Sequence, residues 1–164
     1  MVKQAVKVVV RTRPTANFAS QNIEINAPTN NIIFTIPKQL DKGVINNQQE
    51  SWKFKFDKIM HNASQEDVYD ACGRDIVASV LDGYNGTILC YGQTGAGKTF
   101  TMTGSSSNYK YRGMIPRAIS QIFQEIGARY EQAVTVKVSY VEIYNELMFD
   151  LLSPIPTDQQ NGND

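Results

Sequence analysis

The chain has 164 residues, of which 41% are hydrophobic and 20% are charged, a composition typical of one compact globular domain. Sixteen Lys and Arg balance sixteen Asp and Glu, and this zero net charge argues against a sequence-wide nucleic-acid or membrane-surface binder. No apolar run approaches the roughly 20 residues of a membrane span, and the first residues lack the apolar core of a signal peptide.

The charged and sulfur-containing residues are unevenly placed. Residues 1–58 hold nine basic and four acidic side chains, which leaves open an acidic partner beside the simpler interpretation of a solvated basic face. Cys72 and Cys90 show no metal or redox spacing and lie in apolar patterns, so we interpret them as reduced core residues of an intracellular protein. His61 has no partner pattern, which favours a surface loop.

The first third of the chain predicts three strands. Residues 5–11 are rich in valine and end before Pro14, which biases Arg13 away from a helix. Residues 32–36 form a short apolar run. In residues 52–56, aromatic side chains alternate with lysine, the period of a half-buried strand with a basic polar face.

Two helices are predicted from apolar spacing. Ser64, with Asp67 three residues later, has the pattern of a helix start, and Gly83 supplies a stop. The apolar positions between them recur at helical spacing: Val68, Cys72, Ile76, Val77, Val80 and Leu81. A second helix begins at Ile115-Pro116, since proline suits a first helical turn, and its apolar stripe is Ile115, Ile119, Ile122, Phe123 and Ile126.

Two further strands complete the pattern. Residues 87–91 are a continuous apolar run, typical of a central strand buried on both faces. Residues 134–144 begin with alternating valines and predict a long strand. Strands that alternate with helices predict an α/β sheet covered by helices on both faces, with any ligand at the carboxyl edge of its strands.

A glycine-rich segment follows the predicted strand 87–91 and precedes residues that can begin a helix. It fits the pattern G-x-x-x-x-G-K-[ST] in full and consists of Gly92, Gln93, Thr94, Gly95, Ala96, Gly97, Lys98 and Thr99. Such glycines let the backbone turn its N–H groups toward a polyphosphate, and the helix dipole adds to the attraction. Lys98 can reach the β- and γ-phosphates, and the Thr99 hydroxyl can ligate Mg²⁺. A plain glycine turn would need neither side chain, so the pattern predicts a nucleotide cradle.

Hydrolysis requires more than this cradle, because a carboxylate must support the Mg²⁺ shell and other groups must place the attacking water. The candidate for an apolar strand that ends in Asp is 147–150. Its run is short, Glu146 adjoins it, and it falls in the turn after the long predicted strand. We interpret this segment as structural, with Asp150 capping or ion-paired.

Four blocks of sequence, in order, resemble the kinesin motor domain family. The phosphate-loop block comprises Asn85-Gly86-Thr87, Tyr91 through Thr99, Thr101-Met102 and Gly104. The other blocks are Val10-Arg11-Thr12-Arg13-Pro14; Phe54–Ile59 with Ser64-Gln65 and Val68-Tyr69; and Ser139–Glu146 with Asp150-Leu151-Leu152. The resemblance covers residues 7 to 152. Within the family, residues 43–49 with Trp52, and Asn108-Tyr109-Lys110 before Arg112-Gly113, resemble the kinesin-9 subgroup, which is associated with cilia and flagella.

The resemblance implies an α/β fold, a three-layer P-loop NTPase with a central, mainly parallel or mixed sheet. It implies ATP or ADP with Mg²⁺ as ligands and a microtubule-stimulated ATPase that drives movement. Tubulin is the implied partner, with no nucleic acid or membrane, and the oligomeric state stays open. The implied location is the cytoplasm, on the microtubule cytoskeleton or a ciliary or flagellar axoneme.

The resemblance also implies roles for single residues. Lys98 and Thr99 would serve catalysis, with Thr99 on Mg²⁺, and residues 92–99 would bind phosphates. Arg11, Arg13 and Pro14 would line the adenine side of the nucleotide. Phe100, where many kinesins have His, would pack on the base from the other side, and packing into the core at a helix start is an equal alternative. Glu142 and Tyr144 alternate along the predicted strand, which favours scaffold and surface roles.

The family's switch I and switch II motifs, most of its microtubule-binding elements and its neck linker have no counterpart in these 164 residues. Residues 1–152 are therefore expected to be the amino-terminal part of a motor domain, and 153–164 a polar loop or disordered end. Such a part should have an incomplete sheet with exposed apolar surface and open edges. By itself it should not hydrolyse ATP.

Two other functions stay open at this stage. One is a truncated module that binds nucleotide or a partner without hydrolysis. The other is a P-loop kinase for a small molecule, although no second basic cluster or acceptor base is evident.

Overall fold

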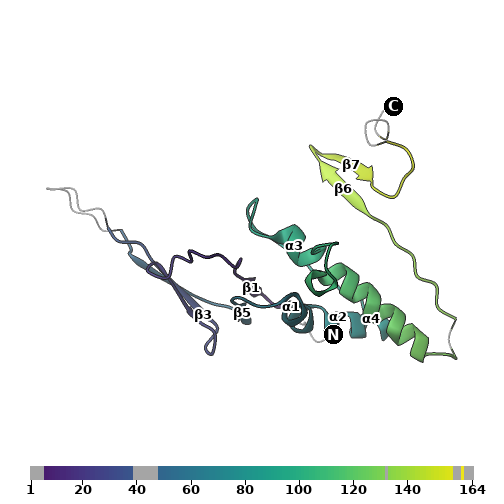
Figure 1. Ribbon diagram of the computed structural model, residues 1–164, viewed down its shortest axis with the longest axis horizontal. Helices are drawn as coiled ribbons and strands as arrows, with labels where there is room; N and C mark the ends of the chain where they lie inside the picture. The colour runs from purple at the N-terminus through teal and green to yellow at the C-terminus, as the bar shows by residue number, and fades with distance from the viewer. Residues whose placement is uncertain (1–5, 39–47, 132, 157–159, 161–164) are drawn as a thin grey trace. The chain divides into compact units, whose positions relative to one another are not determined.

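The computed structural model describes residues 6–38, 48–131, 133–156 and 160. Strands β1 to β5 come first, then helices α1 to α4 with a short 3₁₀ helix before α4, and finally strands β6 and β7 (Figure 1). The chain divides into two compact units, Met1–Glu125 and Ile126–Asp164. Among the described residues, no helix has the length and apolar character needed to cross a membrane.

The first unit contains two small sheets. Strand β1 (Val9–Arg11) pairs in parallel with β5 (Lys58–Met60). Strands β2 (Ile23–Asn26), β3 (Asn31–Thr35) and β4 (Ser51–Lys55) form an antiparallel sheet in that order. The strands predicted at 32–36 and 52–56 are thus confirmed with a shift of one residue, and the one at 5–11 is shorter. Residue 5, and residues 43–47 of the subgroup resemblance, lie outside the described ranges.

The antiparallel sheet is held by apolar contacts between β3 and β4. Phe34 lies opposite Trp52, and the rings of Phe34 and Phe54 meet edge to face with centroids 5.9 Å apart. Ile32, opposite Phe54, is only 3% exposed. These pairs place the aromatic side chains of the alternating segment together, while Lys53 and Lys55 are exposed, as the period of two predicts.

The strand predicted at residues 87–91 is wrong. This segment has no strand hydrogen bonds in the described part of the chain, and Leu89 and Tyr91 are 86% and 94% exposed. A strand is defined by its partner, and here no neighbouring strand supplies the ladder. Within the described part of the first unit, the two small sheets therefore do not join into the central sheet that we predicted, and the exposed apolar side chains agree with an incomplete α/β fold.

The predicted helix after Ser64 is present as two helices, α1 (Gln65–Cys72) and α2 (Arg74–Leu81). The Ser64 hydroxyl accepts from the Asp67 amide at 3.1 Å, and the Asp67 carboxylate accepts from the Ser64 amide at 3.0 Å, a complete capping box. Gly73 separates the helices, and a Cβ there would meet the Tyr69 ring at 2.8 Å. Close packing explains this glycine.

Helices α3 (Lys98–Met102) and α4 (Met114–Ala128) follow, separated by a 3₁₀ helix at Tyr109–Tyr111. Helix α4 confirms the prediction from Ile115-Pro116 within one residue. The buried core of the first unit joins α1, α4 and β5 through Met60, Val68, Tyr69 and Met114. This core places β1, the start of α1 and α3 close to one another.

The second unit contains a hairpin of β6 (Val141–Tyr144) and β7 (Leu147–Asp150). The long strand predicted from residue 134 is therefore wrong in its first half, since 134–140 form no ladder in the described residues. The segment 147–150 is a strand and not a turn. The Asp150 carboxylate accepts from the Leu152 amide at 2.9 Å, a local side-chain turn that agrees with a structural role for this segment. Residues 153–156 and 160 form no helix or strand, and the rest of the predicted end is not described.

Candidate nucleotide-binding site

The glycine-rich loop 92–97 ends where α3 begins. Gly97 is the cap of α3 and has φ 101°, and Gly95 has φ 80°. Both values lie in the left-handed region that side chains with a Cβ rarely adopt. A Cβ at either position would meet no atom within 4 Å. Glycine is therefore needed at these positions for the backbone conformation and not to avoid a clash.

The loop leaves backbone donors open. Among the described residues, the Ala96 amide donates to the Gln93 carbonyl at 3.1 Å. No hydrogen bond there uses the amide N–H of Gly95, Gly97, Lys98 or Thr99. Unpaired amides around a left-handed turn form a concave anion site. The loop therefore fits a polyphosphate.

Lys98 lies over the same loop. Its ammonium donates to the Gly92 carbonyl at 2.8 Å and to the Gln93 carbonyl at 3.0 Å. These bonds hold the lysine across the loop without an anionic partner. Thr99, in the first turn of α3, is exposed, which suits a hydroxyl that would ligate Mg²⁺. The described residues contain no cluster of three His, Cys, Asp or Glu side chains that could hold a metal.

Two arginines, at the end of β1 and just after it, reach the loop and α3. The Arg13 guanidinium donates to the Gly95 carbonyl at 2.7 Å. The Arg11 guanidinium donates to the Thr101 hydroxyl at 2.9 Å and lies 5.7 Å from the centroid of the Phe100 ring. Burial lowers the pKa of Arg11 from its ordinary value, against smaller opposite effects of Cys90 and Cys72. The structure thus brings Arg11, Arg13 and Phe100 beside residues 92–99.

Phe100 is 42% exposed, and its ring lies 6.5 Å from that of Tyr111. This exposure argues against the core-packing alternative. Pro14 is exposed directly after Arg13. Of the other residues expected at the site, Gln93, Thr94 and Ala96 are exposed along the loop.

Gln65, the first residue of α1, was missed as a site residue. It is 4% exposed and contacts Arg11, Phe100 and Tyr111. A polar residue in the first turn of a helix is usually solvated, so the position of Gln65 in the sequence did not predict these contacts. The adjoining Ser64 cap predicted the helix and not this contact.

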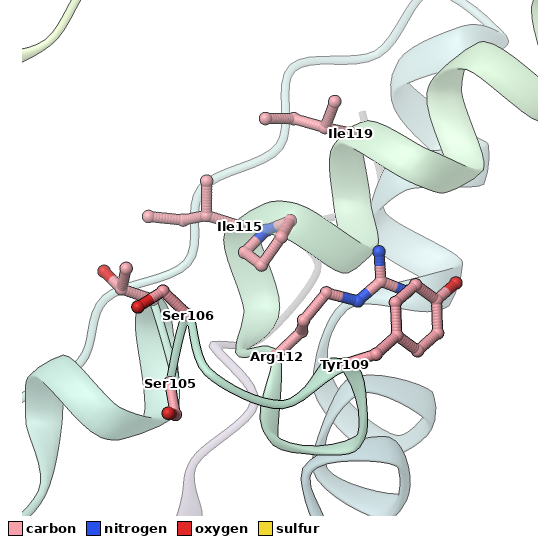
Figure 2. Close-up of a pocket in the computed structure, with 8 residues that line it drawn as sticks. Ser105, Ser106, Tyr109, Arg112, Ile115 and Ile119 are labelled. Carbon is pink, nitrogen blue, oxygen red and sulfur yellow. The ribbon is translucent and has the colours of Figure 1, made fainter.

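A separate groove of about 510 Å³ lies between the loop after α3 and the start of α4 (Figure 2). The Arg112 guanidinium stacks on the Tyr109 ring at 3.3 Å from its centroid, and Ile115 and Ile119 project from α4 (Figure 2). None of the residues that line this groove belongs to the loop 92–99. The groove is therefore distinct from the phosphate cradle.

Comparison with known proteins identifies the relatives of this chain. Residues 11–163 match the Kinesin motor domain family. The kinesin-like protein KIF9 of Mus musculus is 53% identical over 154 residues, which are 94% of this chain and 20% of that protein. The kinesin-like protein KLP1 of Chlamydomonas reinhardtii is 50% identical over 156 residues, which are 95% of this chain and 20% of that protein. The chain thus spans about a fifth of the length of these curated relatives.

Proposed function

The chain belongs to the kinesin motor domain family, and from this premise we propose that it forms the nucleotide-binding part of an ATP-driven microtubule motor. The observation that carries the proposal is the loop 92–97, with its unpaired amides and with Lys98 held across it. The similarity to KIF9 supports assignment to the kinesin-9 subgroup. The comparisons do not favour the truncated, non-hydrolysing module, because the relatives are named as kinesins.

Binding would use this chain's own groups in three places. The amides of Gly95, Gly97, Lys98 and Thr99 would donate to phosphate oxygens, and the Lys98 ammonium would exchange its carbonyl partners for the β- and γ-phosphates. The Thr99 hydroxyl would help to hold Mg²⁺, which would supply positive charge beside the phosphates. Arg11, Arg13 and Pro14 would line one side of the adenine, with Phe100 on the other.

The same proposal covers ATP hydrolysis, the filament on which the motor would move and its place in the cell. Hydrolysis would need the γ-phosphate sensors and the aspartate of the switch motifs, which the 164 residues do not contain. The motor would act on tubulin, in the cytoplasm on microtubules, with a ciliary or flagellar axoneme as the setting that the subgroup implies.

Nucleotide binding by Lys98 tests the proposal. In the full-length protein, Lys98→Ala should weaken ATP binding by about 100-fold, because a charge-assisted bond to phosphate is lost. Titration of a fluorescent ATP analogue measures this affinity, and microtubule-stimulated phosphate release measures turnover. The matched control is Lys110→Ala, an exposed lysine of the 3₁₀ helix, which should bind and hydrolyse as the unmodified protein does. Equal affinity of both variants would refute the assignment of the cradle.

A further inference from the structure

The side chain of Gln65 is buried and fully used. Its carbonyl oxygen Oε1 accepts from the Arg11 guanidinium at 2.8 Å. Its amide Nε2 donates to the Phe100 carbonyl at 2.6 Å and to the Tyr111 carbonyl at 3.1 Å. One carboxamide therefore joins the end of β1, helix α3 and the 3₁₀ helix to the start of α1.

Helix α3 needs such an anchor. It has five residues, too few for a helix to be stable by its own hydrogen bonds. The Phe100 carbonyl lies inside this helix, so the bond from Gln65 fixes the backbone that carries the Phe100 ring. The same bond ties α3 to α1, which packs in the buried core.

The hydrogen bonds continue from Gln65 to the glycine loop. Arg11, held by Gln65, also donates to the Thr101 hydroxyl at 2.9 Å, and Thr101 donates to the Gly97 carbonyl at 2.9 Å. Gln65 thus holds two neighbouring groups beside the cradle, the Arg11 guanidinium and the residue that carries the Phe100 ring, and these lie 5.7 Å apart.

We propose that Gln65 is a positioning residue of the nucleotide site, which fixes Arg11 and Phe100 as two neighbouring groups that contact the base. This inference rests on the proposed function. Gln65 bonds Arg11 and the Phe100 backbone directly and reaches the loop only through Thr101, so its loss should weaken recognition of the base more than the phosphate contacts of Lys98 and Thr99.

The test compares a ligand with a base and a ligand without one. In the full-length protein, Gln65→Glu keeps the acceptor for Arg11 but turns an oxygen toward the Phe100 and Tyr111 carbonyls. Calorimetric titration should show ADP binding weakened about tenfold, and binding of inorganic tripolyphosphate changed less than about twofold, both with Mg²⁺. The KM for ATP should rise by a similar factor with kcat nearly unchanged, because a contact present equally in the ground and transition states is lost.

The matched control is Gln121→Glu. Gln121 is the other buried carboxamide and donates to the Arg74 carbonyl at 3.3 Å, among α1, α2 and α4. This variant should lower the melting temperature without changing either affinity. If Gln65→Glu does not fold, Gln65→Met provides an uncharged replacement of similar size, and the same selective loss of ADP binding is expected.

The outcomes separate this proposal from the proposed function. Failure of the unmodified protein to bind ADP would overturn both. Normal ADP binding by the unmodified protein, with equal loss of ADP and tripolyphosphate in the Gln65 variants, would overturn only the positioning role. ADP binding that is unaffected by either Gln65 substitution would also overturn the positioning role. An equal rise of the KM for ATP in Gln121→Glu would do the same.

Discussion

Tyr69 is a buried polar residue whose partner is known. It is 3% exposed, its hydroxyl donates to the Gln121 side chain, and its ring lies under the Arg74 guanidinium at 5.7 Å. Burial, the largest cause, raises the pKa of the Tyr69 phenol above its ordinary value. The folded protein therefore favours the neutral phenol more strongly than the unfolded chain does.

This shift has a definite sign for stability. Below about pH 10 both states hold the phenolic proton, and above it the unfolded chain releases the proton first. The contribution of Tyr69 to the free energy of unfolding should therefore be complete at neutral pH and fall as pH rises from about 10 toward the folded pKa. In thermal denaturation of the full-length protein, the melting temperature of Tyr69→Phe should approach that of the unmodified protein between pH 9 and 11. A constant difference across this range would contradict the shift.

Among single residues, those of the phosphate loop could be predicted from the sequence, whereas Gln65, which supports the groups beside it, could not. The spacing of Gly92, Gly95, Gly97, Lys98 and Thr99 is a local pattern, so the sequence was sufficient to locate it. Gln65 acts over 35 residues to Phe100 and 54 to Arg11, and its own neighbours in sequence specify only a helix start. Contacts of this range depend on how β1, α1 and α3 pack.

Among the elements, the hairpin β6–β7 carries a measurable strain. Its two turn residues, Asn145 and Glu146, have φ 48° and 65°. Two consecutive left-handed residues form the turn that matches the twist of a two-stranded hairpin. Asn tolerates this conformation, whereas Glu is disfavoured by about 1 kcal/mol.

Glu146→Gly should therefore stabilise the hairpin by about 1 kcal/mol. Amide hydrogen exchange of residues 141–150 in the full-length protein measures this change as slower exchange. Glu142→Gly, the same substitution within β6, is the matched comparison and should speed exchange, because glycine in a strand loses more conformational freedom. Faster exchange in both variants would show that the turn is not strained.

The predicted elements differ in outcome for a physical reason. Helix α1 was predicted because the Ser64 and Asp67 side chains cap it locally, and α4 because its apolar stripe and Pro116 lie within the helix itself. The strands at 87–91 and 134–140 failed because a continuous apolar run or an alternation of side chains indicates burial and not the partner that must hydrogen-bond to the backbone. The strands β2 and β5 were missed because three or four residues give too few alternations to recognise.

For the whole molecule, the exposed apolar residues decide how the 164-residue chain should behave by itself. In the first unit, Leu89 and Tyr91 are almost fully exposed, and several apolar side chains of α4 are also exposed to a smaller extent, with Phe123 at 57%. In the second unit, Val138 is 67% exposed beside an unpaired backbone. Exposed apolar side chains with open strand backbones favour association.

The isolated chain should therefore be poorly soluble or form a molten state without a sharp transition. Light scattering should increase with protein concentration, and differential scanning calorimetry should show a broad, weak unfolding peak. A monomer by sedimentation that also melts in one cooperative transition would contradict this prediction.

The unpaired segment 87–91 also has a consequence during synthesis. In any longer protein of this family, these residues leave the ribosome before the chain beyond residue 164 exists. Translation adds about 5–20 residues per second, so Leu89 and Tyr91 would face the cytosol for many seconds before later segments could cover them. A chaperone that binds extended apolar peptides would protect the nascent chain in this interval, and the phosphate loop that follows directly would gain its final support only when that chaperone departs.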